Sequence, residues 1–176
     1  WVSYGHSCTW AHSASVLPGG DLCFYLSYGR IVDAEIREKY RNNLVIHASN
    51  LPKGRGWSPV SWLILDGQHH FTVTLFEAVN DIDAGPIYAQ KDFELGNTEL
   101  IDEWRNELGK VVMELAGEFV AGHPCSISAN RSQEGEPTYY EKRKPKDSEL
   151  NIDKTLREQF NLLRIVDNER YPAFFS

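Results

Sequence analysis

Two short apolar runs on either side of a helical segment constrain the fold of this chain more than any other feature. Residues 22–28 are rich in aromatic side chains and residues 44–46 are Leu-Val-Ile, lengths that fit buried strands better than helices. Between the runs, Asp33 is a predicted helix N-cap, and Ile36 and Tyr40 are spaced to share one helix face. A strand–helix–strand unit favours parallel pairing and places ligands at the carboxyl ends of its strands.

The remainder of the chain predicts two more strands and three helices. The strands are residues 71–76, which alternate in polarity, and residues 87–89, beyond a tight turn at 81–85. The helices begin at Ser58-Pro59, at Asn97 or Thr98, and at Asp153. The second helix is the longest, because apolar residues recur at helical spacing as far as Phe119. These elements predict an α/β fold with a mostly parallel sheet and flanking helices.

The predicted domain division falls after residue 129. Residues 1–129 are expected to form the core, and residues 130–176 an extended segment and a helix packed on it. The polar stretch 130–137 is the candidate linker, and the run that follows it predicts an extended, basic, irregular segment.

Net charge disfavours a large nucleic-acid partner. The 176 residues carry a formal charge of -7, and the sequence pI is near 5.4, whereas affinity for nucleic acids rests mainly on clustered Lys and Arg. We therefore expect small-molecule substrates and neither a nucleic acid nor a membrane as partner. Whether the chain forms a homo-oligomer stays open.

The cysteines and the absence of long apolar runs favour a cytoplasmic location. Cys8, Cys23 and Cys125 are an odd set without a CxxC pair, which is typical of free thiols in a reducing compartment. No apolar run is long enough to span a bilayer, and no signal-peptide pattern is present. The same pattern predicts no metal site.

One imidazole and one carboxylate stand out as candidates for chemistry. His47 follows a buried strand, where parallel α/β folds place reacting groups, and Asp83 lies at the tip of a second tight loop. A carboxylate beside the imidazole would let it alternate between base and charged donor. The residues alone leave open that His47 only hydrogen-bonds a carbonyl and that Asp83 only stabilises its turn. No nucleophile elbow, HExxH motif or cysteine partner accompanies the pair, which favours acyl transfer over serine or zinc hydrolysis.

Spaced motifs around this pair carry a resemblance to a known family. They are His47-Ala-Ser-Asn-Leu-Pro52, Arg55-Gly56, Ser58-Pro59, the turn Asp83-Ala-Gly-Pro-Ile87, and the stretch 140–147 with Arg164 and Tyr171-Pro172. Together they resemble the N10-formyltetrahydrofolate-dependent formyltransferases. The wording Ser-Asn-Leu-Pro-Lys-Gly-Arg-Gly-Trp-Ser-Pro is most similar to small bacterial sugar N-formyltransferases of the type associated with pseudaminic-acid-like sugars. The resemblance covers most of the chain from Asp21 onward.

The resemblance implies a Rossmann-like formyltransferase core. The family's first strand and helix would precede Trp1, so either the sequence is trimmed or the fold is abbreviated at its N-terminus. It also implies that His47 and Asp83 match the family's catalytic His and Asp. In that family an Asn usually stands two residues before the His, a position that Val45 occupies here. Asn50, in the following loop, is a candidate to supply the missing amide.

The resemblance further implies where two substrates bind. The formyl donor, N10-formyltetrahydrofolate, is expected at Leu26, Ser27, Tyr28, Asp81 and Ile82, although Leu26 and Ile82 could simply be core residues. A nucleotide-linked sugar is expected at Lys53, Arg55 and Trp57 and at the basic run after Tyr140, because aromatic rings stack on bases and cations meet a diphosphate.

These observations predict transfer of a formyl group from the folate to the primary amine of a nucleotide-linked amino sugar, in the biosynthesis of a surface polysaccharide or a nonulosonic-acid-type sugar. Three alternatives stay open: a formyltetrahydrofolate hydrolase, a methionyl-tRNA-formyltransferase-like enzyme, and a non-catalytic module that binds folate or sugar. Consumption of the folate, with and without an amine, would separate them.

Overall fold

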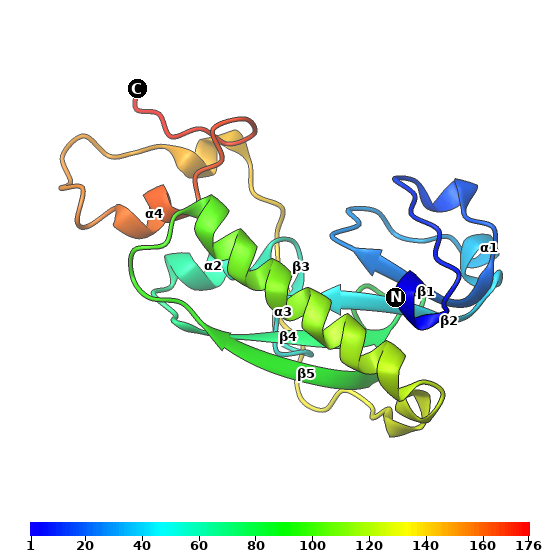
Figure 1. Ribbon diagram of the computed structural model, residues 1–176. Helices are drawn as coiled ribbons and strands as arrows, with labels where there is room; N and C mark the ends of the chain where they lie inside the picture. The colour runs from blue at the N-terminus through cyan, green and yellow to red at the C-terminus, as the bar shows by residue number, and fades with distance from the viewer.

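Four strands form one mixed sheet in the order β1-β2-β4-β5 (Figure 1). The computed structural model describes residues 1–176 apart from the side chain of Tyr4. The strands are β1 (Gly20–Leu26), β2 (Tyr40–His47), β4 (His70–Glu77) and β5 (Ile87–Glu94). The first two pair in parallel, which confirms the predicted strand–helix–strand unit, and the other two pairings are antiparallel. The α/β prediction therefore holds with a mixed sheet in place of a mostly parallel one, since the short loop joining β4 to β5 permits only antiparallel pairing.

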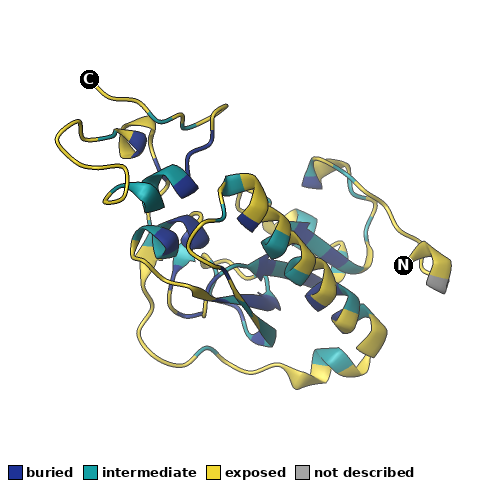
Figure 2. Ribbon diagram, turned by 60° about the vertical axis from the view of Figure 1, so that its left-hand side comes forward, coloured by how far each residue is buried: buried dark blue, intermediate teal, exposed yellow. Residues whose placement is uncertain are grey.

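Side chains alternate along the strands and enter cores on opposite faces of the sheet. Leu44 and Ile46 of β2 pack with Phe119 of the long helix α3 (Ile101–Gly122). Tyr25 of β1 faces the other way and packs with Val32, beside the short helix α1 (Ala34–Arg37). Figure 2 shows the consequence: buried residues follow the strands and the inner side of α3, whose outer side is exposed.

A second apolar cluster joins three helices at the amino-terminal end of α3. Val60 and Ile64 of α2 (Pro59–Leu65) pack with Trp104 of α3 and with Ile165, just after α4 (Phe160–Arg164). The Trp104 indole N–H donates to the carbonyl of Arg164 at 3.0 Å. The predicted helix at Ser58-Pro59 is confirmed. The long helix is confirmed too, although it begins at Ile101, three residues after the predicted Thr98, and continues to Gly122.

Two helix predictions need correction. Tyr40 does not lie on the first helix, because α1 ends at Arg37 and Tyr40 already begins β2. Asp153 caps no helix, because α4 begins only at Phe160. The intervening residues instead bond locally, as where the Gln159 amide donates to the carbonyl of Asn151 at 3.0 Å. Such side-chain bonds to the backbone compete with helix formation.

The chain after α3 returns to the sheet and is not a free linker there. Arg131 exchanges both backbone hydrogen bonds with Ile87, at 2.7 and 2.8 Å. Farther on, β6 (Tyr139–Tyr140) pairs in parallel with β3 (Arg55–Gly56) in the loop after β2. The prediction that residues 130–137 form a linker is thus wrong, because Arg131 is paired with Ile87 and β6 pairs with β3 just beyond this stretch. A division of the chain after residue 129 stays a prediction.

Candidate active site

His47 is the last residue of β2 and lies opposite Thr74 of β4. Because Ile46 faces α3, strand alternation turns the imidazole to the opposite face of the sheet. Only 12% of the side chain is exposed there. The sequence placed His47 directly after the apolar run, and the structure includes it as the last residue of the strand, where pairing with Thr74 fixes its backbone.

The loop between β2 and α2 folds back over the imidazole. His47 Nε2 lies 2.9 Å from the carbonyl oxygen of Gly54, and since a carbonyl only accepts, Nε2 carries the hydrogen in this contact. Gly54 and Gly56 have φ values of 75° and 96°, which glycine adopts without strain. A Cβ on Gly56 would lie 2.5 Å from the carbonyl oxygen of Tyr140. The two glycines therefore let the loop pass close to β6.

Asp83 reaches the same place from the loop between β4 and β5. Its Oδ2 lies 3.7 Å from His47 Nε2 and accepts a hydrogen bond from the Gly56 N–H at 2.8 Å. The φ of Asp83 is 49°, in the left-handed region that is uncommon for residues other than glycine. The carboxylate is therefore bonded to the opposing loop, which goes beyond a role in its own turn.

The arrangement suits proton transfer. With the Nε2 hydrogen held by Gly54, the neutral imidazole has Nδ1 as its proton-accepting nitrogen. An imidazolium formed at His47 would lie beside a carboxylate that a backbone N–H already orients. A base paired with an orienting acid group is the usual arrangement of general acid–base catalysis. Nearby, burial raises the pKa of Tyr140, and the negative charge of Asp66 adds to that rise.

Asn50 contacts neither member of the pair among the described hydrogen bonds. Its side-chain oxygen accepts from the Gln90 amide at 3.1 Å, and the same amide nitrogen lies 2.9 Å from Thr74 Oγ1. Val45, at the family's Asn position, packs against an apolar cluster that includes Leu51. The valine side chain at position 45 therefore has no amide group to offer. Asn50 is connected to Thr74 of β4 through the Gln90 amide.

The five residues expected to hold the folate divide into two groups. Leu26 is half-buried in the core under α3, and Tyr28 packs beside α1 in the same cluster as Ala78. Exposed residues form the second group, Ser27, Asp81 and Ile82. Ile82 is 51% exposed, so the reading of this side chain as core is wrong. Tyr28, after β1, and Ala78, at the start of the loop that carries Asp83, thus pack on the same apolar cluster.

The three residues expected to hold a sugar nucleotide are differently placed. Lys53 is exposed. The Arg55 guanidinium donates to Gln133 Oε1 at 2.7 Å and to the Tyr139 hydroxyl at 3.2 Å, so the protein itself uses it. The Trp57 side chain is 40% exposed, and Lys142 Nζ lies 4.5 Å from the centre of one ring.

Sequence reasoning missed the residues that close the site from the far end of the chain. The Gln133 amide donates to the carbonyls of Asp83 and Gly85, at 2.8 and 2.9 Å. Thr138 accepts from the Gly54 N–H through its hydroxyl at 2.8 Å and from the Arg55 N–H through its carbonyl at 2.9 Å. The polar composition that suggested a linker hid these contacts, and the extended segment at 138–140 was their one sequence signal.

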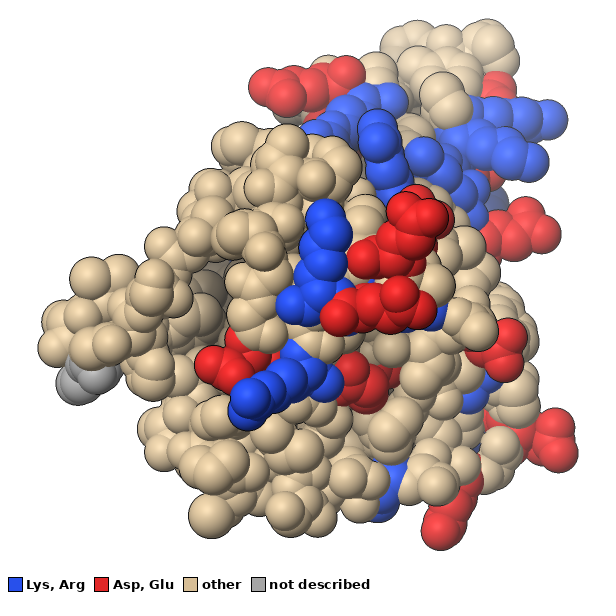
Figure 3. Space-filling view, turned by 90° about the vertical axis from the view of Figure 1, so that its right-hand side faces the viewer, with Lys and Arg blue, Asp and Glu red and all other residues tan. Residues whose placement is uncertain are grey.

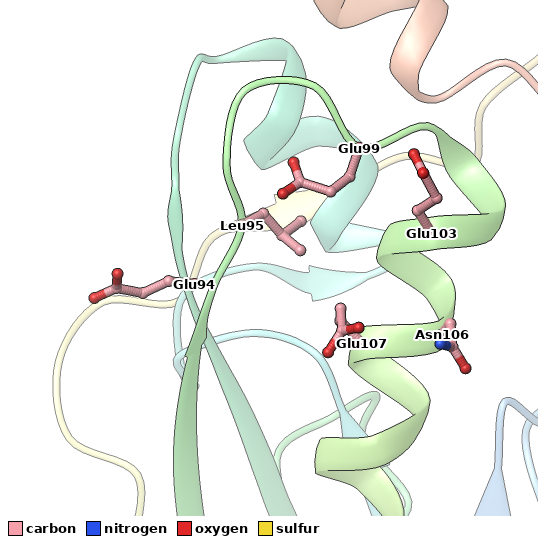
Figure 4. A pocket seen from close by; sticks show the side chains of 6 residues that line it. All are labelled: Glu94, Leu95, Glu99, Glu103, Asn106 and Glu107. Atoms are coloured by element: carbon pink, nitrogen blue, oxygen red, sulfur yellow. The ribbon is translucent and has the colours of Figure 1, made fainter.

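The hollow in Figure 4 is unrelated to this site. It measures about 440 Å³ and lies between the end of β5 and the start of α3, where four of its six lining residues are glutamates. Glu99 and Glu103 accept hydrogen bonds from the N–H groups of Gly96 and Leu100, at 2.7 and 2.8 Å. Glu103 therefore caps the start of α3, and Glu99 holds the turn that leads into it. No group of three metal-ligating side chains occurs among the residues described, and no helix described there, α3 included, is apolar and long enough to cross a membrane.

Comparison with known proteins assigns the family. Residues 17–115, more than half of the chain, match the family model described as formyl transferase, so the chain belongs to the formyl transferase family. It is 30% identical over 145 residues to a methionyl-tRNA formyltransferase from Thermodesulfovibrio yellowstonii, covering 82% of this chain and 47% of that protein. The chain spans about half the length of the curated relatives it matches.

Solved structures share the fold. A methionyl-tRNA formyltransferase from Clostridium thermocellum is 28% identical, with a TM-score of 0.72 over 87% of this chain and 66% of that one. WlaRD, a sugar 3N-formyl transferase solved in the presence of dTDP and 5-N-formyl-THF, is 24% identical, with a TM-score of 0.67 over 86% of this chain and 56% of its own. Similar proteins thus divide between a tRNA substrate and a sugar substrate.

Proposed function

We propose that this protein transfers a formyl group from N10-formyltetrahydrofolate to the amine of a nucleotide-linked amino sugar, with His47 as the group that moves the proton. The observation that carries the proposal is the contact of His47 with both Gly54 and Asp83, made in a chain of the formyl transferase family. The folate supplies the one-carbon unit, and the chain supplies orientation and proton transfer.

The two polar contacts define what His47 does. Because Gly54 holds the Nε2 hydrogen, Nδ1 of the neutral ring accepts the proton that the attacking amine loses, and later returns it to the departing nitrogen. Asp83 stabilises the imidazolium in between. Asn50 is a candidate donor to the negative charge that develops on the formyl oxygen, because its amide nitrogen has no partner among the described hydrogen bonds.

The proposed folate site combines an exposed apolar side chain with free backbone. Ile82 is half exposed although it is apolar, which suits one wall for a flat ring system. Ser27 follows β1 with a φ of 51° and is exposed, so its backbone groups can bond a ring amide. The residues present at the end of β1 and in the Asp83 loop therefore fit a pterin.

A sugar amine is favoured over a tRNA by the distribution of charge. The formal charge of -7 opposes a large polyanion. Figure 3 shows Lys and Arg side chains gathered toward the top of the view. Of the cations after β6, Lys142 lies with its Nζ 4.5 Å from the Trp57 ring centre, and Lys144 and Lys146 follow it in the sequence. A local patch beside the exposed Trp57 ring suits one nucleoside diphosphate, with the ring as a stacking surface for the base.

One assay tests the reaction. The chain is incubated with N10-formyltetrahydrofolate alone, with a panel of nucleotide-linked amino sugars, or with methionyl-tRNA, and formation of tetrahydrofolate is followed. Turnover that requires one of the sugars supports the proposal. Release of formate at the same rate without an amine would identify a hydrolase, turnover only with the tRNA would replace the sugar, and folate binding without consumption would reduce the chain to a binding module.

A second measurement tests the nucleotide site. Lys53→Ala is expected to weaken binding of the accepted sugar nucleotide about threefold to tenfold, the size of one exposed charge-assisted contact. Lys154→Ala, an exposed lysine of the C-terminal segment, is the matched control. Unchanged affinity in Lys53→Ala would remove Lys53 from the site.

A further inference from the structure

We propose that Gln133 is a positioning residue that holds the two halves of the active site, the Asp83 loop and the loop at Gly54–Gly56, in one fixed relation. The inference rests on the proposed function, because it concerns the pair formed by His47 and Asp83. Gln133 lies fifty residues beyond Asp83 in the sequence and touches neither side chain of the pair.

The first part of the argument is that one side chain joins both loops. The Gln133 amide nitrogen donates to the carbonyls of Asp83 and Gly85, and its oxygen accepts from the Arg55 guanidinium at 2.7 Å. Only this orientation of the amide is chemically consistent, because the two carbonyls can only accept and the guanidinium can only donate. Both N–H donors of the amide and its oxygen therefore bond to active-site loops.

The second part concerns what those loops hold. Arg55 stands between Gly54, whose carbonyl contacts the His47 imidazole, and Gly56, whose N–H bonds the Asp83 carboxylate. On the other side, Gln133 bonds the backbone of Asp83 itself, a residue with a φ of 49° that needs support from its surroundings. Gln133 thus bonds the backbone beneath the carboxylate and the residue between the two glycines.

The third part is that Gln133 is itself anchored. Backbone hydrogen bonds tie Arg131 to Ile87 just before it, and β6 pairs with β3 just after it. The side chain is half-buried between these attachment points. Because its backbone is fixed on both sides, the Gln133 amide can hold the two loops at a constant distance, which a residue in an unattached loop could not do.

Two variants of different chemistry test the role. Gln133→Ala removes all the bonds. Gln133→Glu keeps the shape and an acceptor for Arg55 but cannot donate, so it sets carboxylate oxygens against the carbonyls of Asp83 and Gly85. Both are expected to lower kcat about 10- to 100-fold, the size of an ångström-scale misplacement, with KM for the folate nearly unchanged. Glu134→Ala, at the exposed neighbouring position, is the control with wild-type kinetics.

A readout independent of turnover keeps the inference separate from the proposed function. In the wild type, imidazole ¹⁵N spectra are expected to show the His47 tautomer with the hydrogen on Nε2. In both variants the spectra should show a mixture of the two tautomers. The thermal unfolding temperature of Gln133→Glu should stay within a few degrees of the wild-type value. A wild-type tautomer in both variants would overturn the positioning role even if no substrate were known. Wild-type kcat in Gln133→Glu would overturn it as well. A wild type that transfers no formyl group, with altered tautomers in the variants, would contradict only the proposed function.

Discussion

The chain after α3 contacts the rest of the molecule in two regions that are built in different ways. At residues 131–140 it meets the His47 and Asp83 loops through backbone pairing, two glycines with positive φ and the Gln133 amide. Near the start of α3 it inserts one buried arginine, Arg164, and a second, Arg143, is buried within the C-terminal segment itself. Arg164 donates to the carbonyls of Gly96 and Glu99, at 2.9 and 3.2 Å, and Arg143 to the carbonyl of Ile165 at 3.0 Å.

The two regions differ in what they contribute: residues 131–140 fix the geometry of the active site, and the buried arginines contribute to the stability of the fold. Burial lowers the pKa of both guanidiniums, and nearby carboxylates oppose that shift, so each charge must be compensated by several bonds. The region at 131–140 contains no buried charge of this kind, since Arg131 is exposed and Arg55, which the region meets through Gln133, is only half-buried. We therefore expect changes near His47 to act on turnover and changes at the buried arginines to act on folding.

The largest expected effect separates the regions directly. His47→Ala should lower turnover about 10²- to 10³-fold, because the proton-transferring group is lost. Folate affinity should change little, and the free energy of unfolding should fall by only about 1 kcal/mol, since the Gly54 carbonyl loses its partner. Steady-state kinetics, folate titration and urea unfolding measure the three quantities. His69→Ala, an exposed histidine outside the site, is the control. Turnover like that of the wild type in His47→Ala would end the mechanism.

The opposite pattern is expected at the second region. Arg164→Ala leaves buried carbonyls without a donor and should lower the free energy of unfolding by about 3 kcal/mol, with kcat of the folded fraction retained. Urea unfolding measures the loss. Arg157→Ala, an exposed arginine just before α4, should change stability little. Equal losses in the two variants would contradict the structural role of the buried guanidinium.

A substitution at the loop over His47 should affect both quantities. In Gly56→Ala the added Cβ meets the Tyr140 carbonyl oxygen at a φ of 96°, so we expect a loss of about 2 kcal/mol in stability and a fall in kcat. Gly117→Ala in α3, where an added Cβ meets nothing within 4 Å, should be stabilising by about 0.5–1 kcal/mol. Calorimetry and kinetics on the two variants give the contrast. The changes in the free energy of unfolding of Gly56→Ala and Gly117→Ala must have opposite signs, and equal signs would contradict the prediction.

The smallest expected effect is a change in the pH dependence of stability through Glu99. Burial alone would raise the pKa of Glu99, but hydrogen bonds from backbone N–H groups and the charge of Arg164 outweigh it and lower that pKa below its ordinary value of 4.5. Ionised Glu99 therefore stabilises the fold above about pH 4.5, and this contribution is lost as the pH falls through the lowered pKa. In Glu99→Gln, the urea midpoint should fall less between pH 5 and pH 3 than in the wild type. Glu134→Gln should follow the wild type, and identical pH profiles for all three proteins would contradict the prediction.

Much of the site could be predicted because its signals are local. The apolar run before His47 placed the imidazole at the end of a strand, and the Asp81–Gly85 motif placed a carboxylate on a tight loop. One failure depends on distant partners. The polar composition of 130–137 suggested a linker, yet Gln133 bonds residues about fifty positions away. The other failure is local. The apolar spacing after Asp153 suggested a helix, whereas side-chain bonds to the nearby backbone take its place, Leu156 is exposed and α4 begins only at Phe160.

The sequence by itself determined the strands, the long helix α3 and the family, because periodicity, glycines and short motifs act over a few residues. Tertiary structure alone decided that the sheet is mixed, that Asp83 bonds Gly56 beside His47, and that Gln133 joins the loops that hold them. The physical reason is that a hydrogen bond across the fold depends on the register of strands and the path of loops. Neither the register nor the loop path can be inferred from the composition of the segment that makes the hydrogen bond.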